Sequence, residues 1–231
     1  MNIKKLGFAL LATGAAIFSG CEADEGKGKD SSNNYVEIIA KVENGNTYNS
    51  VYKTVKAIYF DYTYSTYNEP IAHIVATGNY SNGGFTVKLP QTPDKPLAFL
   101  DVQSYEAKGI KISNRNAKGL YFGLILGYDN NGKDVGYYFV HGRVNNVNSF
   151  TRVLYYYFDR DISITGSHFD TETNFEESYD AFMTEGWNKV YVTKSISANG
   201  ITRHEYTTQE PGGLKWYRND DINVSDKSLY N

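Results

Sequence analysis

Residues 120–144 read LYFGLILGYDNNGKDVGYYFVHGRV, and this stretch decides the fold class. Two runs rich in Leu, Ile, Val, Tyr and Phe flank the polar segment Asp129–Gly132. Its Asn-Gly step tolerates the positive φ angles that a type I′ turn requires. The flanking runs, Leu120–Tyr128 and Val135–Val144, are therefore predicted to pair as an antiparallel hairpin.

The same two-residue period continues on both sides of this hairpin, with Gly, Asn and Asp between the apolar runs. Phe85, Val87 and Leu89, for example, share one face after a tight turn at Ser81–Gly84. Further strands are expected at 36–42, 51–64, 71–80, 153–158, 162–166, 187–193, 201–207 and 214–217. The chain therefore reads as a series of short strands joined by turns.

For one segment, 173–185, the sequence pattern is consistent with two types of secondary structure. Phe175, Tyr179 and Phe182 are spaced by four and three residues, which is the helical period. The segment is expected to form either a strand or one short helix.

Short strands joined by tight turns favour an all-β fold, with one or two antiparallel β-sandwich modules on a flexible N-terminal tether. Residues 90–96 contain three prolines and are the first candidate boundary. Residues 145–149 are the second, and they are favoured because the hairpin from Leu120 is apolar enough to complete an N-terminal sandwich. The predicted modules are an N-terminal β-sandwich at 35–148 and a C-terminal β module at 149–231.

The first twenty residues have the composition of an export signal. Lys4 and Lys5 precede a mostly apolar run of thirteen residues, Leu6–Phe18, and small residues follow. That run is shorter than the roughly 20 residues that cross a bilayer. Residues 1–20 are therefore predicted to be a cleaved signal peptide.

Cys21, the only cysteine of the chain, follows the small residues directly. The stretch Phe18–Cys21 resembles the lipobox of bacterial lipoproteins, although Phe18 stands where Leu is commonest. The resemblance implies that the Cys21 thiol carries a diacylglyceryl group with acyl chains such as palmitate, which anchor the protein to a membrane. Lipidation would consume the only thiol and so exclude disulfides and thiolate chemistry.

Residues 21–34 contain no apolar side chain larger than Ala after the cysteine and are predicted to be a solvated tether. Removing residues 1–20 leaves 21 basic and 26 acidic side chains, a net charge near −5. This mild acidic balance argues against a nucleic-acid partner and against docking on anionic lipid head groups.

The acidic segment Glu22–Glu25 resembles the signal by which bacteria of the Bacteroides and Flavobacterium group export lipoproteins to the outer face of the outer membrane; a merely hydrophilic linker is the alternative. Tyr80–Pro90, Glu185–Tyr191 and Gly213–Tyr217 are similar to phrases in surface-exposed outer-membrane lipoproteins of the Bacteroides group. The resemblance implies a β fold and a location facing the cell exterior. It implies no activity, because such families have no settled function.

The sequence offers no recognisable metal or catalytic pattern. The histidines nearest in sequence, His141 and His168, are 27 residues apart, whereas zinc sites use local spacings; His73 and His141 are expected in the core or on a sheet face. Asp129–Asp134 offers oxygen ligands but fails the spacing of a calcium loop. Asp159–Asp161 is expected to be a solvated turn. No enzyme activity, cofactor or metal is therefore expected.

Tyrosine is the unusual residue, with 21 among 231. Consecutive tyrosines on a strand point to opposite faces, so some rings are expected at the surface. We take as candidate ligand-binding residues Tyr137, Tyr138, Tyr155, Tyr156 and Tyr157. The alternative is that tyrosine simply suits a half-exposed sheet face.

The two tryptophans, Trp187 and Trp216, are expected to pack in the core. The function predicted is that of a non-catalytic surface lipoprotein that binds an extracellular ligand, with a glycan stacked on tyrosine as the specific expectation. The alternative is a structural or accessory subunit of an outer-membrane surface assembly or transport complex, in which the partner is an outer-membrane protein.

Overall fold

The computed structural model describes residues 35–61, 71–94, 97–224 and 229. Residues 34–231 group into one compact unit. Strands account for 59% of the structure and helical residues for 8%, which confirms the all-β prediction. The predicted signal peptide, the lipidation residue Cys21 and the tether lie outside the described residues.

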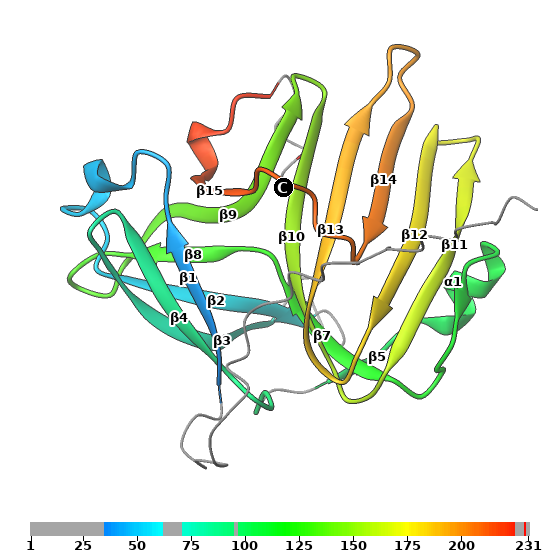
Figure 1. The fold of residues 1–231 in the computed structure, drawn as a ribbon, viewed down its shortest axis with the longest axis horizontal. Helices are drawn as coiled ribbons and strands as arrows, with labels where there is room; N and C mark the ends of the chain where they lie inside the picture. Colours follow the sequence, from blue (N-terminus) through cyan, green and yellow to red (C-terminus); the bar gives the residue numbers. More distant parts are fainter. Residues whose placement is uncertain (1–34, 62–70, 95–96, 225–228, 230–231) are drawn as a thin grey trace, which may run out of the picture. The chain divides into compact units, whose positions relative to one another are not determined.

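The strands shown in Figure 1 are, in chain order, β1 (Tyr35–Lys41), β2 (Thr54–Asp61), β3 (Ile71–Ser81), β4 (Gly84–Pro90), β5 (Ala98–Phe99), β6 (Lys111–Ile112), β7 (Lys118–Phe122), β8 (Ile125–Tyr128), β9 (Asp134–Asn146), β10 (Ser149–Phe158), β11 (Ile162–Asp170), β12 (Phe175–Met183), β13 (Gly186–Ile196), β14 (Thr202–Thr207) and β15 (Lys215–Arg218). The helical elements are η1 (Gly45–Tyr48), α1 (Val102–Ala107) and η2 (Asn219–Asp221).

These fifteen strands form one sheet, whose main path is β1-β4-β3-β2-β8-β9-β10-β13-β14-β12-β11-β6. β15 also pairs with β9, and β7 pairs with both β10 and β5. Among the strands that the structure describes, β12 and β14 pair in parallel, which makes the sheet mixed, and an isolated parallel bridge joins Val42 to Trp216. The parallel pairing of β12 with β14 arises because β14 lies between the consecutive strands β12 and β13 and pairs antiparallel with β13.

The predicted boundary at 148 and 149 falls at the turn of the β9–β10 hairpin. β9 ends at Asn146, which pairs with Ser149, the first residue of β10. One edge of β10 pairs with β9 and then with β7, and its other edge pairs with β13. The sheet is therefore continuous across residues 148 and 149, and the segments 35–148 and 149–231 both contribute strands to it.

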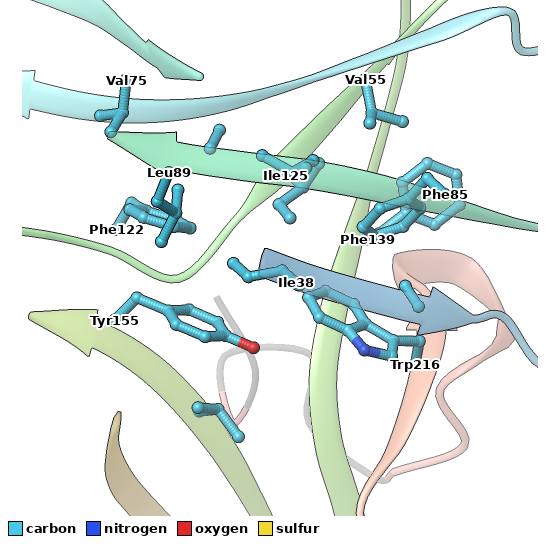
Figure 2. Close-up of a cluster of buried hydrophobic side chains, with 14 of the residues drawn as sticks. Ile38, Val55, Val75, Phe85, Leu89, Phe122, Ile125, Phe139, Tyr155 and Trp216 are labelled. Carbon is cyan, nitrogen blue, oxygen red and sulfur yellow. The ribbon is translucent and has the colours of Figure 1, made fainter. Parts of the chain in front are cut away.

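The largest buried cluster draws on strands from both segments. Figure 2 shows Ile38, Val55, Phe139, Tyr155 and Trp216 converging in it from five different strands. A second cluster forms on the opposite face of β10 and β13, around Leu154 and Phe158 of β10. β10 is thus covered on both faces, which accounts for its nearly continuous apolar sequence.

The prediction of a type I′ turn at Asn131–Gly132 is wrong, although the β8–β9 pairing that it joins is antiparallel as predicted. Only Gly132 has a positive φ there, because the Asp129 carboxylate accepts hydrogen bonds from the backbone N–H groups of Asn131 and Lys133, at 2.8 and 2.9 Å, and holds a longer turn. The turn with two positive φ angles is Asn82–Gly83, between β3 and β4.

The segment 173–185 is resolved as a strand, β12. Residues four apart lie on one face in a helix and in a strand alike, so Phe175 and Tyr179 could not distinguish the two. Phe182 points to the other face and is exposed. The α-helix of the protein's described part lies instead at α1, where the Asp101 carboxylate accepts from the Ser104 N–H and caps the first turn.

Candidate ligand-binding site

An aromatic pocket of about 260 Å³ lies where β1 passes β9, β10, β13 and β15. We call it the seam pocket, and its lining residues are Val36, Glu37, Ile38, Ile39, His141, Tyr155, Trp187, Asn188, Lys189 and Trp216. Only tertiary folding makes this pocket, since its lining comes from five strands spread over 181 residues of the chain.

The floor of the seam pocket is a stacked pair of rings. His141 of β9 and Trp216 of β15 are directly paired across the two strands, so both side chains project from the same face. Their rings lie parallel, with centroids 4.7 Å apart and an interplanar angle of 7°. The inner faces of the two rings cover each other, so the pair lines the pocket mainly with ring edges, among them the polar edge of the imidazole.

A hydroxyl group reaches this floor from β10. Tyr155 Oη lies 3.2 Å from His141 Nδ1, and Figure 2 shows the Tyr155 hydroxyl directed toward the space between Ile38 and Trp216. Which of the two atoms donates depends on the tautomer of the imidazole. The hydrogen bond fixes both groups at the pocket surface.

Burial keeps these two groups neutral. Desolvation, reinforced by the charge of Lys189, lowers the pKa of His141 to about 4, while Glu210 opposes the shift. Desolvation also raises the pKa of Tyr155 well above its usual range. At neutral pH the pocket therefore presents neutral hydrogen-bonding groups inside and the charges of Glu37 and Lys189 at its exposed rim.

Trp187 forms a fixed wall of the pocket. Its indole Nε1–H donates to the Pro90 carbonyl oxygen at 2.8 Å. Its ring meets the rings of Phe122 and Tyr157 edge to face, with centroids 5.7 and 5.5 Å apart. The prediction of core packing is confirmed for Trp216, which is 5% exposed, and Trp187 packs against the same cluster while half-buried.

The five predicted binding tyrosines do not form one surface. Tyr155 and Tyr157 point into the main core and are each 6% exposed, whereas Tyr156 points to the opposite face. Tyr137 is exposed beside the Arg218 guanidinium, and Tyr138 is half-buried against the C-terminal cluster. The expectation of exposed rings on β10 fails for Tyr155 and Tyr157 because both faces of that strand are covered.

Of those five, Tyr155 alone lines the seam pocket. Sequence reasoning missed His141, Trp187 and Trp216 as pocket residues. Each lies in a sequence that alternates apolar and polar residues as an ordinary core strand does. Nothing in the sequence reveals that β15 pairs with β9 and so places Trp216 next to His141.

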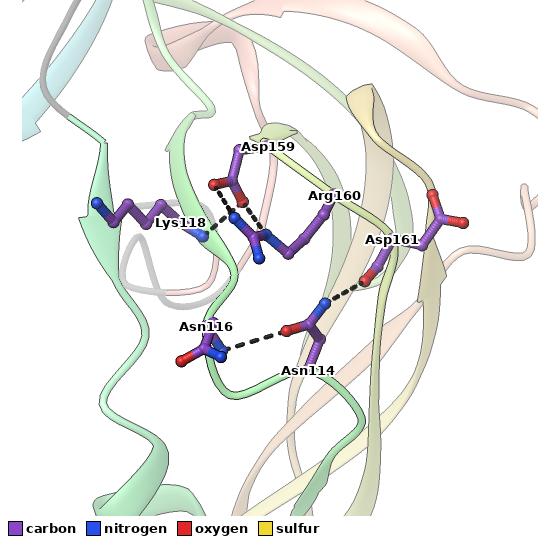
Figure 3. A network of polar contacts seen from close by, with 6 residues as sticks. All are labelled: Asn114, Asn116, Lys118, Asp159, Arg160 and Asp161. Carbon is purple, nitrogen blue, oxygen red and sulfur yellow. Dashed lines mark hydrogen bonds and ion pairs between the residues drawn. The ribbon is translucent and has the colours of Figure 1, made fainter.

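The predicted turn at Asp159–Asp161 joins β10 to β11, and it belongs to a structural network (Figure 3). The Asp159 carboxylate accepts from the Arg160 guanidinium at 3.0 Å and from the Lys118 backbone N–H at 2.9 Å. Asn114 donates to the Asp161 carbonyl oxygen at 3.4 Å. The hydrogen bond from Arg160 is the main cause of the lowered pKa of Asp159. These residues fasten the β10–β11 turn to the start of β7.

The histidines are dispersed, as the sequence suggested, with one exception. His73 stacks on Tyr59 of the neighbouring strand, with centroids 5.9 Å apart. His168 and His204 flank Glu177 in register on three adjacent strands. Within residues 35–61, 71–94, 97–224 and 229, no group of three or more His, Cys, Asp and Glu side chains could hold a metal ion.

No helix in the described part of the chain has the length and apolar character needed to span a bilayer. In comparisons with known proteins, no family model, no curated protein and no solved structure matches this chain.

Proposed function

We propose that this chain is a non-catalytic outer-membrane lipoprotein, anchored by lipidated Cys21 and facing the cell exterior, that binds a glycan at the seam pocket. The observation that carries the binding role is the parallel His141–Trp216 floor with the Tyr155 hydroxyl at its edge. Sugars present flat apolar ring faces together with hydroxyl groups, so an aromatic floor edged by neutral donors and acceptors suits them.

The volume of the seam pocket limits how many sugar units of a glycan could bind in it. Pockets for drug-sized ligands usually enclose about 300–1,000 Å³, and the seam pocket encloses about 260 Å³. It therefore suits a terminal sugar unit better than a long internal segment.

The binding role is tested by paired tyrosine variants in a soluble chain that begins at residue 34. Tyr155→Phe removes the hydroxyl at the pocket floor and is expected to weaken sugar binding about three- to tenfold, since one hydrogen bond contributes about 0.5–1.5 kcal/mol. Tyr157→Phe is the matched control, because Tyr157 shares the strand, the face and the burial of Tyr155 but does not line the pocket. A glycan array identifies the sugar, and calorimetry measures its affinity for each variant.

Two outcomes contradict this proposal. One is that the parent chain binds no sugar on the array. The other is that Tyr155→Phe and Tyr157→Phe both bind a sugar with the same affinity as the parent chain.

Membrane attachment is tested at Cys21. Cys21→Ala is expected to move the protein from the membrane fraction to the soluble fraction, because no thiol remains to be acylated. Ser19→Ala is the control, since alanine keeps a small residue before the cysteine. Fractionation and immunoblotting measure the result, and an unaltered membrane fraction for Cys21→Ala would refute lipid anchoring.

An accessory role in a surface assembly is the second candidate, and β1 favours it. β1 is the last strand on its side of the sheet path. Among the described residues its outer edge carries one bridge, between Val42 just after β1 and Trp216. Val36 and Ile39 are 45% and 73% exposed. An open strand edge with apolar side chains can pair with a partner protein. A chain that binds no sugar but co-purifies with an outer-membrane protein would favour this role.

A further inference from the structure

The polar groups of the seam pocket differ in whether the protein already uses them. The side-chain amide nitrogen of Asn188 donates to the carbonyl oxygens of Thr184 and Gly186, at 2.7 and 3.0 Å. Its Oδ1 accepts from the Thr184 backbone N–H at 3.0 Å. The indole N–H of Trp187 is donated to Pro90. These two side chains therefore hold the wall of the pocket in place and offer a ligand little polar contact.

The pair of Tyr155 and His141 keeps one donor hydrogen for a ligand. If the Tyr155 hydroxyl donates to Nδ1, the neutral imidazole carries its proton on Nε2; if Nδ1 donates, the hydroxyl hydrogen is left over. Either tautomer gives a ligand one donor and one acceptor at this end of the pocket. The pair therefore suits a hydroxyl group or a carboxylate oxygen.

Lys189 brings a positive charge beside this pair. Lys189 of β13 is directly paired with Tyr155 of β10, so both side chains project from the same face of the sheet. Lys189 is exposed and lines the pocket. Across residues 35–61, 71–94, 97–224 and 229, no hydrogen bond or ion pair engages its ammonium group. Its donor hydrogens are therefore available to a ligand.

Two acidic side chains lie near the pocket, but Lys189 has the larger influence at the imidazole. The Glu210 carboxylate accepts from the Tyr191 hydroxyl at 2.9 Å, and Glu37 lies on β1, on the other side of the pocket from β13. Burial is the main cause of the lowered pKa of His141; the charge of Lys189 adds to it, and the charge of Glu210 opposes it more weakly. The potential inside the pocket, at the imidazole, is therefore positive.

We propose that the seam pocket selects a terminal sugar that carries a carboxylate, such as a uronic acid, and that Lys189 binds this carboxylate beside Tyr155. This selectivity rests on the sugar-binding role proposed for the pocket and names the class of sugar. An ammonium group and a carboxylate form charge-assisted hydrogen bonds, which are about twice as strong as neutral ones. The donor hydrogen of the Tyr155–His141 pair suits the second carboxylate oxygen or a neighbouring hydroxyl group of the sugar.

Two matched pairs of sugars test this selectivity on the soluble chain that begins at residue 34. Methyl galacturonoside and methyl glucuronoside carry a carboxylate where methyl galactoside and methyl glucoside carry a hydroxymethyl group. Calorimetry is expected to show at least one uronoside binding about three- to tenfold more tightly than its neutral partner. The preference is modest because Lys189 is exposed, and it should shrink as salt is added.

Variants of the two rim charges identify the group responsible. Lys189→Gln removes the charge and is expected to weaken the preferred uronoside about three- to tenfold while leaving its neutral partner unchanged, a split that a merely structural role of Lys189 would not give. Glu37→Gln is expected to strengthen the uronoside about twofold, because a repelling charge is lost. Lys133→Gln, at an exposed lysine in the β8–β9 turn, is the matched control and should change neither affinity.

Acetate separates a sugar site from a general carboxylate site. It carries the charged group without the sugar ring, so it is expected to bind much more weakly than the preferred uronoside. Acetate that binds as tightly as the uronoside would show that the sugar makes no contribution and would overturn the proposed selectivity.

Two further results would overturn it. One is that neither uronoside binds more tightly than its neutral partner, and the other is that Lys189→Gln weakens the uronoside and the neutral sugar equally. Both are compatible with the sugar-binding role of the pocket, which the glycan array and Tyr155→Phe test separately. A chain that binds no sugar on the array contradicts the sugar-binding role and the selectivity together.

Discussion

Phe139→Ala is expected to lower the free energy of unfolding by about 3–5 kcal/mol, which is the usual loss when a buried Phe becomes Ala. Phe139 is fully buried at the centre of the main core. Its ring lies 5.0 Å from that of Tyr52, 5.4 Å from Tyr80 and 5.3 Å from Phe85, measured between centroids. The substitution removes all three ring contacts and leaves a cavity between the strands that enclose the core (Figure 2).

Urea unfolding measures this loss, and thermal unfolding should show a decrease in Tm of roughly 10 °C for a chain of this size. Tyr137→Ala is the matched control on the same strand. Tyr137 is 39% exposed, and its ring faces the Arg218 guanidinium at 4.7 Å. The control should lose at most about 1 kcal/mol. A loss below about 1 kcal/mol for Phe139→Ala would mean that the aromatic cluster does not hold the two halves of the sheet together.

Acid is expected to destabilise the fold between pH 6.5 and 4, because two half-buried histidines are held in the neutral form. The pKa of His141 and that of His204 are each lowered from 6.5 to about 4. Over this window the unfolded chain binds protons that the folded chain does not, so stability falls as the pH falls. Both side chains are partly solvated, which reduces the full linkage value to on the order of 2–3 kcal/mol for each histidine.

Urea unfolding at a series of pH values measures this effect. His141→Phe and His204→Phe should each remove about half of the slope between pH 6.5 and 4, whatever their effect on stability at pH 7. Between pH 8 and 9 neither histidine changes its proton in the folded or the unfolded chain, so the parent and the variants should have parallel profiles. Asp159 and Asp170, whose pKa values are lowered by hydrogen bonds, lose their contribution only below this window. An unchanged slope in both variants would show that the two imidazoles are not buried neutral groups.

Secondary structure was the most predictable property of this chain. The alternation in β4 and in the β8–β9 pair follows directly from side chains that point to opposite faces of a strand. The turn type at Asn131–Gly132 was predicted wrongly because of local hydrogen bonding. The Asp129 carboxylate accepts two backbone hydrogen bonds there and stabilises a longer turn than the type I′ turn expected for Asn-Gly. The prediction at β12 stayed open because spacings of four residues fit a helix and a strand equally well.

The candidate sites were far less predictable. The seam pocket depends on the pairing of Trp216 with His141, which are 75 residues apart, and on the passage of β1 beside them. The stacked pair of Tyr121 and Tyr156 depends in the same way on β7 pairing with β10. Each contact is made by strand order and register, and neither property is specified by the local pattern of one strand.

The sequence by itself determined that the chain is built from strands, where most of them lie, and that one cysteine follows an apolar N-terminal segment. These properties are local, because side-chain alternation and turn residues act over two to ten positions. Only the tertiary structure decided which tyrosines reach solvent. Consecutive residues of β10 alternate between faces in any strand, but coverage of both faces by distant segments buried Tyr155 and Tyr157 and left Tyr121 exposed.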